Sequence, residues 1–204
     1  MNTDFIKKRL SSTFSIPPSI RGDYDLNPNM QRYDALLTPA VVLVPLVVKE
    51  KTITILLTKR NKNLPHHPGQ ISFPGGRVDT SDKTPKETAL REVKEEIGID
   101  RGNIKVIGSL DAYETRTGFS VIPLVGFVYP PYQILPDPDE VAEVFEIPLS
   151  FCMHPDNHLQ HQRRFKGELR RFYALTYNEY FIWGATAGMI VNLYDLLKLK
   201  KTMD

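Results

Sequence analysis

The sequence has one cysteine, no long hydrophobic run and almost no charge imbalance, and each of these shortages excludes a class of protein. The single cysteine, Cys152, excludes an intramolecular disulfide and a metal site built from several cysteines. The longest apolar stretch, 39–48, is far shorter than the ~20 residues that a membrane-spanning helix requires. A net charge of +2 does not favour nucleic acid or an anionic membrane as a partner. We therefore expect a cytoplasmic protein that acts on a small molecule.

The composition is that of an ordinary globular chain. Of its 204 residues 41% are hydrophobic, which is enough to bury one sizeable core, and we find no internal repeat. Prolines interrupt the first 34 residues. We predict a short helix over 4–11 and an irregular arm within 1–34, followed by a single domain over 35–199 that includes a C-terminal helix.

The pattern of β-branched residues predicts a sheet. Runs at 40–48 and 52–58, separated by three charged residues, indicate an antiparallel hairpin, and the polar, Pro- and Gly-rich stretch 61–77 after it indicates a functional loop. Further elements are predicted as strands at 103–111 and 120–130, a strand or short helix within 140–153, two β-like pieces within 161–183 and an amphipathic helix over 185–199.

A helix beginning at residue 85 has clear start and stop signals. Thr84 is a suitable N-cap, Pro85 suits the first helical position, and Glu87 completes a capping box. Gly98 marks the end of the helix.

Three glutamates lie on one side of this helix. Glu92, Glu95 and Glu96 fall within a face about 100° wide, and like charges at that spacing repel each other. A hard divalent cation, Mg²⁺ or Mn²⁺, would offset this repulsion and leave coordination positions for phosphate oxygens and water. The spacing alone also allows a solvated acidic face that binds no metal.

The stretch 73–99 resembles the Nudix box, whose pattern is Gx5Ex7REUxEExGU with U an aliphatic residue. Its second half matches at every defined position, through Arg91, Glu92, Val93, Glu95, Glu96, Gly98 and Ile99. In the first half Asp82 stands where the family has Glu, and eight residues instead of seven separate it from Arg91.

A second motif, over 56–76, resembles the signature that precedes the box in coenzyme A pyrophosphatases. The residues that fit are Leu56, Leu57, Thr58, Arg60, Gly69, Phe73, Pro74, Gly75 and Gly76. Asn61 replaces the usual Ser or Ala, and Pro65 replaces the usual second Arg.

This resemblance implies a Nudix fold, an α/β/α sandwich with a mixed β-sheet. It also implies hydrolysis of coenzyme A at its pyrophosphate to 4′-phosphopantetheine and adenosine 3′,5′-bisphosphate, with Mg²⁺ or Mn²⁺ as cofactor. Glu92, Glu95 and Glu96 become the expected metal ligands, and Glu92 a candidate base. Together with Arg91, which we expect to orient them, they form the expected catalytic set. The expected substrate-binding residues are Arg60, Gly69, Phe73, Gly75 and Gly76.

Several alternatives stay open from the sequence. The substrate could be another nucleoside diphosphate derivative, such as NADH or ADP-ribose, and a catalytically silent binding module is a further reading. Glu140 is either an additional catalytic base or a loop charge, and the role of Asp82 is undecided. A homodimer is also possible.

Overall fold

The computed structural model describes residues 1–11, 19–29, 36–165 and 167–198. The predicted boundary residues 35 and 199 lie outside these ranges. Four α-helices are described: α1 (Thr3–Ser11), α2 (Pro85–Ile97), α3 (Leu149–Cys152) and α4 (Ala185–Leu197). Within the described ranges, no helix combines the length and the hydrophobicity needed to cross a membrane.

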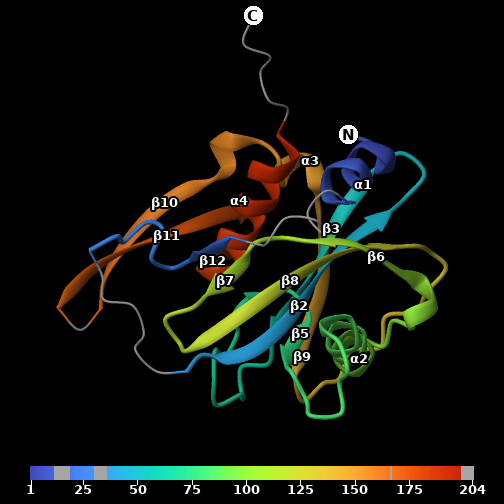
Figure 1. Ribbon diagram of the computed structural model, residues 1–204, viewed down its shortest axis with the longest axis horizontal. Helices are drawn as coiled ribbons and strands as arrows, with labels where there is room; N and C mark the ends of the chain where they lie inside the picture. Colours follow the sequence, from blue (N-terminus) through green and yellow to red (C-terminus); the bar gives the residue numbers. More distant parts are fainter. Residues whose placement is uncertain (12–18, 30–35, 166, 199–204) are drawn as a thin grey trace, which may run out of the picture.

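The strands form two sheets (Figure 1). The larger sheet contains β1 (Ile20–Gly22), β2 (Thr38–Val48), β3 (Ile53–Arg60), β4 (Ile71–Ser72), β5 (Gly75–Arg77), β6 (Ile104–Ser109), β7 (Ala112–Glu114), β8 (Phe119–Val128) and β9 (Val141–Pro148). The smaller sheet contains β10 (Leu159–Phe165), β11 (Glu168–Tyr177) and β12 (Tyr180–Trp183).

The larger sheet is mixed, as predicted. Strand β2 pairs antiparallel with β3 in the predicted hairpin, and parallel with β8 on its other side. The sheet is also larger than the sequence suggested. Part of the expected irregular arm forms β1, which pairs with β7, and the Gly-Gly segment expected to be loop forms β5, which pairs with β2. Both short strands depend on partners distant in the sequence, so local patterns could not reveal them.

Two hydrophobic cores lie on opposite faces of this sheet. Because side chains alternate along a strand, Val41 and Leu43 of β2 face α2, whereas Val44 and Leu46 face α1 and α4. Figure 1 shows α2 on one side of the sheet and α1 and α4 on the other. The result is the predicted α/β/α sandwich.

The two terminal helices confirm the sequence patterns. Ile6 and Leu10 of α1 are fully buried in the core that α4 also enters. In α4 the predicted apolar stripe is buried except at Leu196, which is half-buried, and Leu193 and Leu197 are inaccessible to solvent. The N-terminal helix therefore packs as part of the same body as the sheet, while the division of the chain at residue 34 stays a prediction.

The region 140–153 combines the two structures that the sequence left open. Strand β9 pairs antiparallel with β3 along most of its length, and α3 follows directly. Cys152 at the end of α3 is a free, fully buried thiol, and burial raises its pKa to about 12. Its place in the core agrees with a structural cysteine.

Candidate active site

The start of α2 is capped nearly as predicted. The Thr84 side chain accepts a hydrogen bond from the backbone N–H of Glu87 at 3.2 Å, and Pro85 occupies the first turn. The Glu87 carboxylate accepts from the backbone N–H of Lys83 at 2.7 Å, one residue before the cap, so the capping box is shifted by one residue. Gly98 ends the helix with φ 77°, as expected for a left-handed C-cap.

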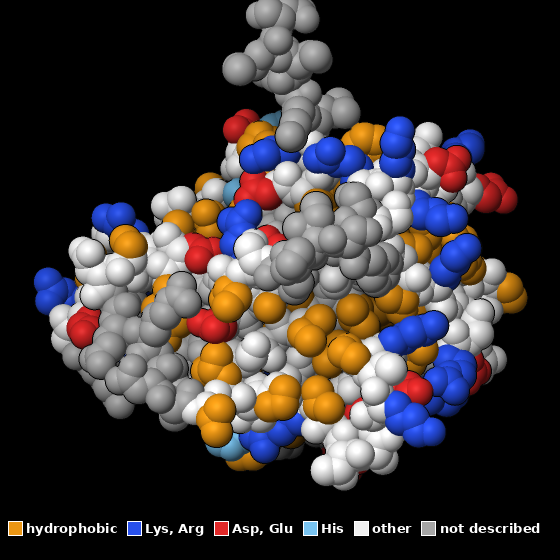
Figure 2. All heavy atoms as spheres, in the orientation of Figure 1, with side chains coloured by type: hydrophobic (Ala, Val, Ile, Leu, Met, Phe, Trp, Pro, Cys, Tyr) orange, Lys and Arg blue, Asp and Glu red, His pale blue; other side chains and the backbone are white. Residues whose placement is uncertain are grey.

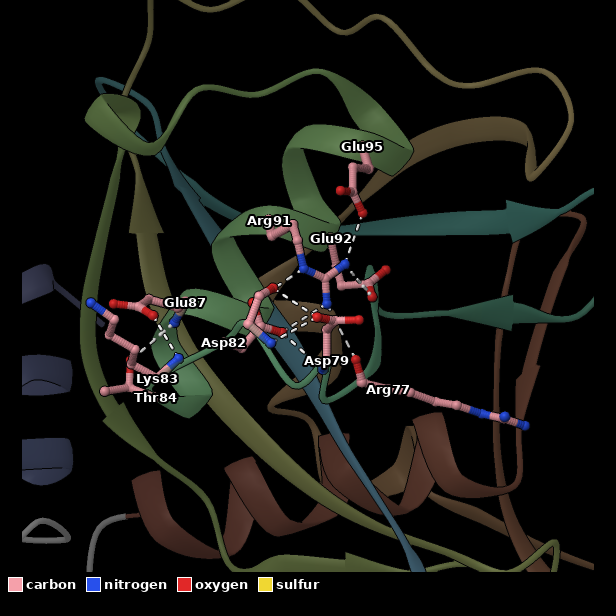
Figure 3. A network of polar contacts seen from close by, with 10 residues as sticks. Arg77, Asp79, Asp82, Lys83, Thr84, Glu87, Arg91, Glu92 and Glu95 are labelled. Atoms are coloured by element: carbon pink, nitrogen blue, oxygen red, sulfur yellow. Dashed lines mark hydrogen bonds and ion pairs between the residues drawn. The ribbon is translucent and has the colours of Figure 1, made fainter.

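Arg91 joins α2 to the loop before it (Figure 3). Its guanidinium binds Asp82 with two parallel bonds, Nε to Oδ1 at 3.2 Å and Nη2 to Oδ2 at 2.9 Å. This charge-assisted fork holds the pKa of Asp82 well below its usual range. Nη1 donates to Glu92 and to Glu95, both at 2.9 Å, and Nη2 also reaches the carbonyl of Arg77. Arg91 thus orients two of the predicted carboxylates.

The structure shows what Asp82, whose role the sequence left undecided, contacts: its carboxylate binds Arg91. A tight turn over 79–82 places it, through bonds between Asp79 and Asp82 in both directions. The loop that holds Asp82 ends at Thr84, and α2 begins at Pro85. The signal in the sequence was the acidic residue six positions after Gly76.

Glu92 lies against the Gly-Gly segment. A Cβ atom on Gly76 would overlap the Glu92 carboxylate, with Cδ only 2.5 Å away, so glycine is required for this close approach. At Gly75 the φ of 152° and the nearby backbone of β2 leave no room for a side chain. Burial raises the pKa of Glu92, against the lowering effect of Arg91.

Glu96 is the buried member of the acidic face. The residue is only 4% exposed, and its Oε2 has no hydrogen-bond partner in the described part of the chain. Burial, and after it the charge of Glu92, raises the pKa of Glu96 to about 8, while Arg60 and the Gly75 N–H act in the opposite direction. A buried carboxylate oxygen without a partner is a costly arrangement unless a ligand completes it.

The three glutamates differ more than their helical spacing suggested. Glu92 and Glu96 are withdrawn from solvent, whereas the Glu95 side chain is 59% exposed and is bound by Arg91. Among the described residues, no three acidic, His or Cys side chains are grouped as a ready metal site. The Glu92–Glu96 pair nevertheless fits a hard cation, because it supplies unpartnered carboxylate oxygen and accumulated negative charge.

Of the upstream residues, Arg60 and Phe73 have clear surroundings. Arg60 ends β3, acts electrostatically on Glu96, and its buried Nε has no hydrogen-bond partner within the described residues. Phe73 is 2% exposed and belongs to the core, so its side chain anchors the loop. Gly69 lies in the turn after the exposed Pro65 and has a φ of 69°, so this position requires a residue that tolerates a left-handed backbone.

The sequence did not predict how Asn61 is used. Its side-chain Nδ2 donates to the carbonyl of Pro138 at 2.6 Å, and its backbone N–H donates to the carbonyl of Glu140 at 2.8 Å. Glu140 lies near enough to Glu92 and Glu96 for its charge to raise the pKa of both. The acidic loop therefore belongs to the site, although only its Asp and Glu content indicated this in the sequence.

Comparison with known proteins assigns the family. The NUDIX domain family matches residues 36–172 of the chain. This chain belongs to the Nudix family. This protein is therefore an enzyme that acts on pyrophosphate bonds. Nudix hydrolases generally use divalent metal ions.

Similar proteins support the same assignment. The Nudix hydrolase NudL of Enterobacter sp. (strain 638) is 42% identical over 173 residues, which cover 82% of this chain and 87% of NudL. The NudL of Pectobacterium atrosepticum is 36% identical over 178 residues, covering 87% and 86%. A MutT/nudix family protein from Enterococcus faecalis has a similar fold, with TM-score 0.50 and 17% identity over 81% of this chain and 63% of that one.

Proposed function

We propose that this Nudix hydrolase cleaves the pyrophosphate of coenzyme A or a derivative of it, with Mg²⁺ or Mn²⁺ held by Glu92, Glu96 and Glu95. The observation that carries the metal site is the unpartnered Oε2 of Glu96, buried beside Glu92 and Arg60. The substrate rests on the upstream block from Leu56 to Gly76, which resembles the coenzyme A pyrophosphatase signature.

The reaction needs few groups from the protein. A bound divalent cation neutralises phosphate charge and lowers the pKa of a water molecule. The water oxygen bonds to one phosphorus while the bond from that phosphorus to the bridging oxygen breaks, and the bridging oxygen leaves with the other phosphate. Glu92, which Arg91 holds against the Gly-Gly segment, takes up the proton of the water.

The remaining residues position these groups. Arg60, whose Nε has no partner in the described residues, is available to neutralise phosphate oxygens. Arg91 holds Glu92 in place through its fork with Asp82. Gly76 permits the Glu92 carboxylate to lie directly against the loop.

Location and assembly are part of the proposal. We propose a cytoplasmic location, because a single cysteine fits a reducing compartment. A homodimer stays a prediction that gel filtration with light scattering would test.

The test is hydrolysis of coenzyme A by the purified protein with Mg²⁺ or Mn²⁺, run in parallel with NADH and ADP-ribose. We expect adenosine 3′,5′-bisphosphate from coenzyme A at a much higher rate than products from the other two. Glu96→Gln should lower the rate by about 100-fold or more, because it removes a charged ligand. Glu50→Gln, a change of the same kind at an exposed turn, is the matched control and should keep full activity.

Two results would change the proposal. Faster cleavage of NADH or ADP-ribose would retain the metal site but reject coenzyme A as substrate. Absence of metal-dependent cleavage of all three would instead support a binding module.

A further inference from the structure

Arg77 is anchored at the active site by its backbone, whereas its side chain points away from it. Arg77 ends β5 and directly follows Gly76, against which the Glu92 carboxylate lies. Its carbonyl accepts a hydrogen bond from Arg91 Nη2 at 3.3 Å. Figure 3 shows the Arg77 side chain extending away from Arg91 and Glu92. The guanidinium is therefore held beside the proposed metal site but outside it.

The Arg77 guanidinium lies over the ring of Phe119. Arg77 pairs with Ala40 on one side of β2. Phe119 pairs with Thr38 on the other side of the same strand. Because alternate residues of a strand point to the same face, both side chains share one face of the sheet. The guanidinium carbon is 5.4 Å from the ring centroid, within the range of a cation–π contact. The ring covers one face of the guanidinium and leaves its in-plane N–H groups available to an anion.

These N–H groups have no acceptor in the described part of the chain. Among the described residues, no carboxylate or other acceptor binds the Arg77 guanidinium, although the side chain is exposed. By contrast, Arg91 binds Asp82 at 2.9 Å. Arg116 lies 3.8 Å from Glu168. A guanidinium that is held over a ring and has unused donors is suited to bidentate binding of a phosphate.

A second anionic group on the substrate requires a cation of its own. Figure 2 shows Lys and Arg side chains mainly around the edge of the visible face, and the net charge of the chain is only +2. A phosphate must therefore be bound by individual cations, because the protein offers no strong overall field. Arg60 acts on Glu96, where we expect the pyrophosphate. The second Arg of the related signature is absent, since the exposed Pro65 replaces it.

We propose that Arg77, held over Phe119, binds the 3′-phosphate of coenzyme A and so selects coenzyme A over dephospho-coenzyme A, which has a 3′-hydroxyl. In coenzyme A the ribose separates this phosphate from the pyrophosphate. In the protein the length of the Arg77 side chain separates its guanidinium from the backbone beside Glu92. NADH and ADP-ribose have no 3′-phosphate and lack this contact. The inference rests on the hydrolysis of coenzyme A proposed above.

The experiment measures kcat/KM for coenzyme A and for dephospho-coenzyme A with Mg²⁺. The wild type should prefer coenzyme A by about 10- to 100-fold, as expected for hydrogen bonds between charged groups. Arg77→Gln should remove most of this preference and leave the value for dephospho-coenzyme A within about twofold. The loss should appear mainly in KM, because the 3′-phosphate is bound equally before and during the reaction. Arg77→Lys keeps the charge without the planar fork and should recover part of the preference.

Arg101→Gln is the matched control. Arg101 is also exposed and has no acidic partner among the described residues, and the same substitution there should leave both values unchanged. A calorimetric measurement tests binding without hydrolysis, with adenosine 3′,5′-bisphosphate and adenosine 5′-monophosphate as ligands. The wild type should bind the bisphosphate about tenfold more tightly, and Arg77→Gln should bind the two ligands alike.

An equal loss for both substrates in Arg77→Gln would overturn the inference, because it would indicate a structural role. An unchanged preference in Arg77→Gln, or the same loss of preference in Arg101→Gln, would also overturn it. Failure of the proposed function is distinguishable. If coenzyme A is not cleaved but the bisphosphate is preferred through Arg77, the proposed substrate is wrong and the phosphate site stands. If coenzyme A is cleaved no faster than dephospho-coenzyme A by the wild type, the proposed function stands and the inference is wrong.

Discussion

The two adjacent glycines of the loop, Gly75 and Gly76, should respond to alanine in opposite ways. At Gly76 the three atoms nearest to the new Cβ all belong to the end of the flexible Glu92 side chain, and φ is not in the positive range. At Gly75 it would meet the rigid backbone of Val41 and Val42, at a φ of 152° that L-residues rarely adopt. The first change displaces the carboxylate that we propose as metal ligand and base, whereas the second strains the fold.

The magnitudes follow from the contacts. An ordinary Cβ contact begins near 3.4 Å and the Glu92 Cδ lies 2.5 Å from the Gly76 Cβ position, so the carboxylate must move by about 1 Å. A displacement of that size lowers kcat by about 100-fold. The stability of Gly76→Ala should stay within about 1 kcal/mol of the wild type, since alanine also reduces the entropy of the unfolded chain. Gly75→Ala should lose more than about 2 kcal/mol.

Urea unfolding followed by circular dichroism measures the stabilities, and release of adenosine 3′,5′-bisphosphate from coenzyme A measures kcat. The expected result is a folded, nearly inactive Gly76→Ala and a destabilised Gly75→Ala. Activity of Gly76→Ala within threefold of the wild type, or a loss of stability equal to that of Gly75→Ala, would refute the reasoning.

Three further predictions concern the surroundings of the site. Asp82→Asn should be less stable than the wild type at pH 7. Because the pKa of Asp82 is lowered in the folded protein, the ionised carboxylate stabilises the fold above its unfolded pKa of about 4, and this stabilisation is lost as the pH falls below that value. The urea midpoints of the two proteins should therefore converge in acid. Thr84→Ala removes the cap of α2 and should lower the free energy of unfolding by about 1 kcal/mol, with Thr80→Ala as the exposed control; equal midpoints would contradict the role of the cap. Burial raises the pKa of Cys152 to about 12, so iodoacetamide at pH 8 should label the thiol only when urea unfolds the protein, and rapid labelling of the native protein would show that the core is open there.

Local signals in the sequence were sufficient to predict the hairpin and the helices α2 and α4. The hairpin of β2 and β3 followed from two β-branched runs, and α2 followed from Thr84, Pro85 and Gly98. The apolar stripe of α4 likewise predicted the helix, but the structure buries more of it than the stripe, including Val191 and Asn192. In each case the decisive residues lie within one helix or one hairpin, so no knowledge of distant partners was required.

Local sequence signals could not predict contacts between segments that are distant in the chain. Strand β1 forms by pairing with β7, and β5 forms by pairing with residues 40–42 of β2, whereas their own sequences are too short to indicate a strand. The same holds for Asn61, which the motif marked as a departure and the fold joins to a turn nearly 80 residues later.

The acidic face of α2 shows most clearly which features depend on the sequence alone and which depend on the tertiary structure. By itself the sequence determined which carboxylates lie on one side of α2, because helical spacing depends only on residue number. Only the tertiary structure decided that Glu96 is buried with its Oε2 unpartnered among the described residues, that Glu95 is exposed and bound by Arg91, and that Asp82 completes the fork. Burial and pairing depend on what packs against the helix, and those groups come from the loop, from β3 and from the acidic turn.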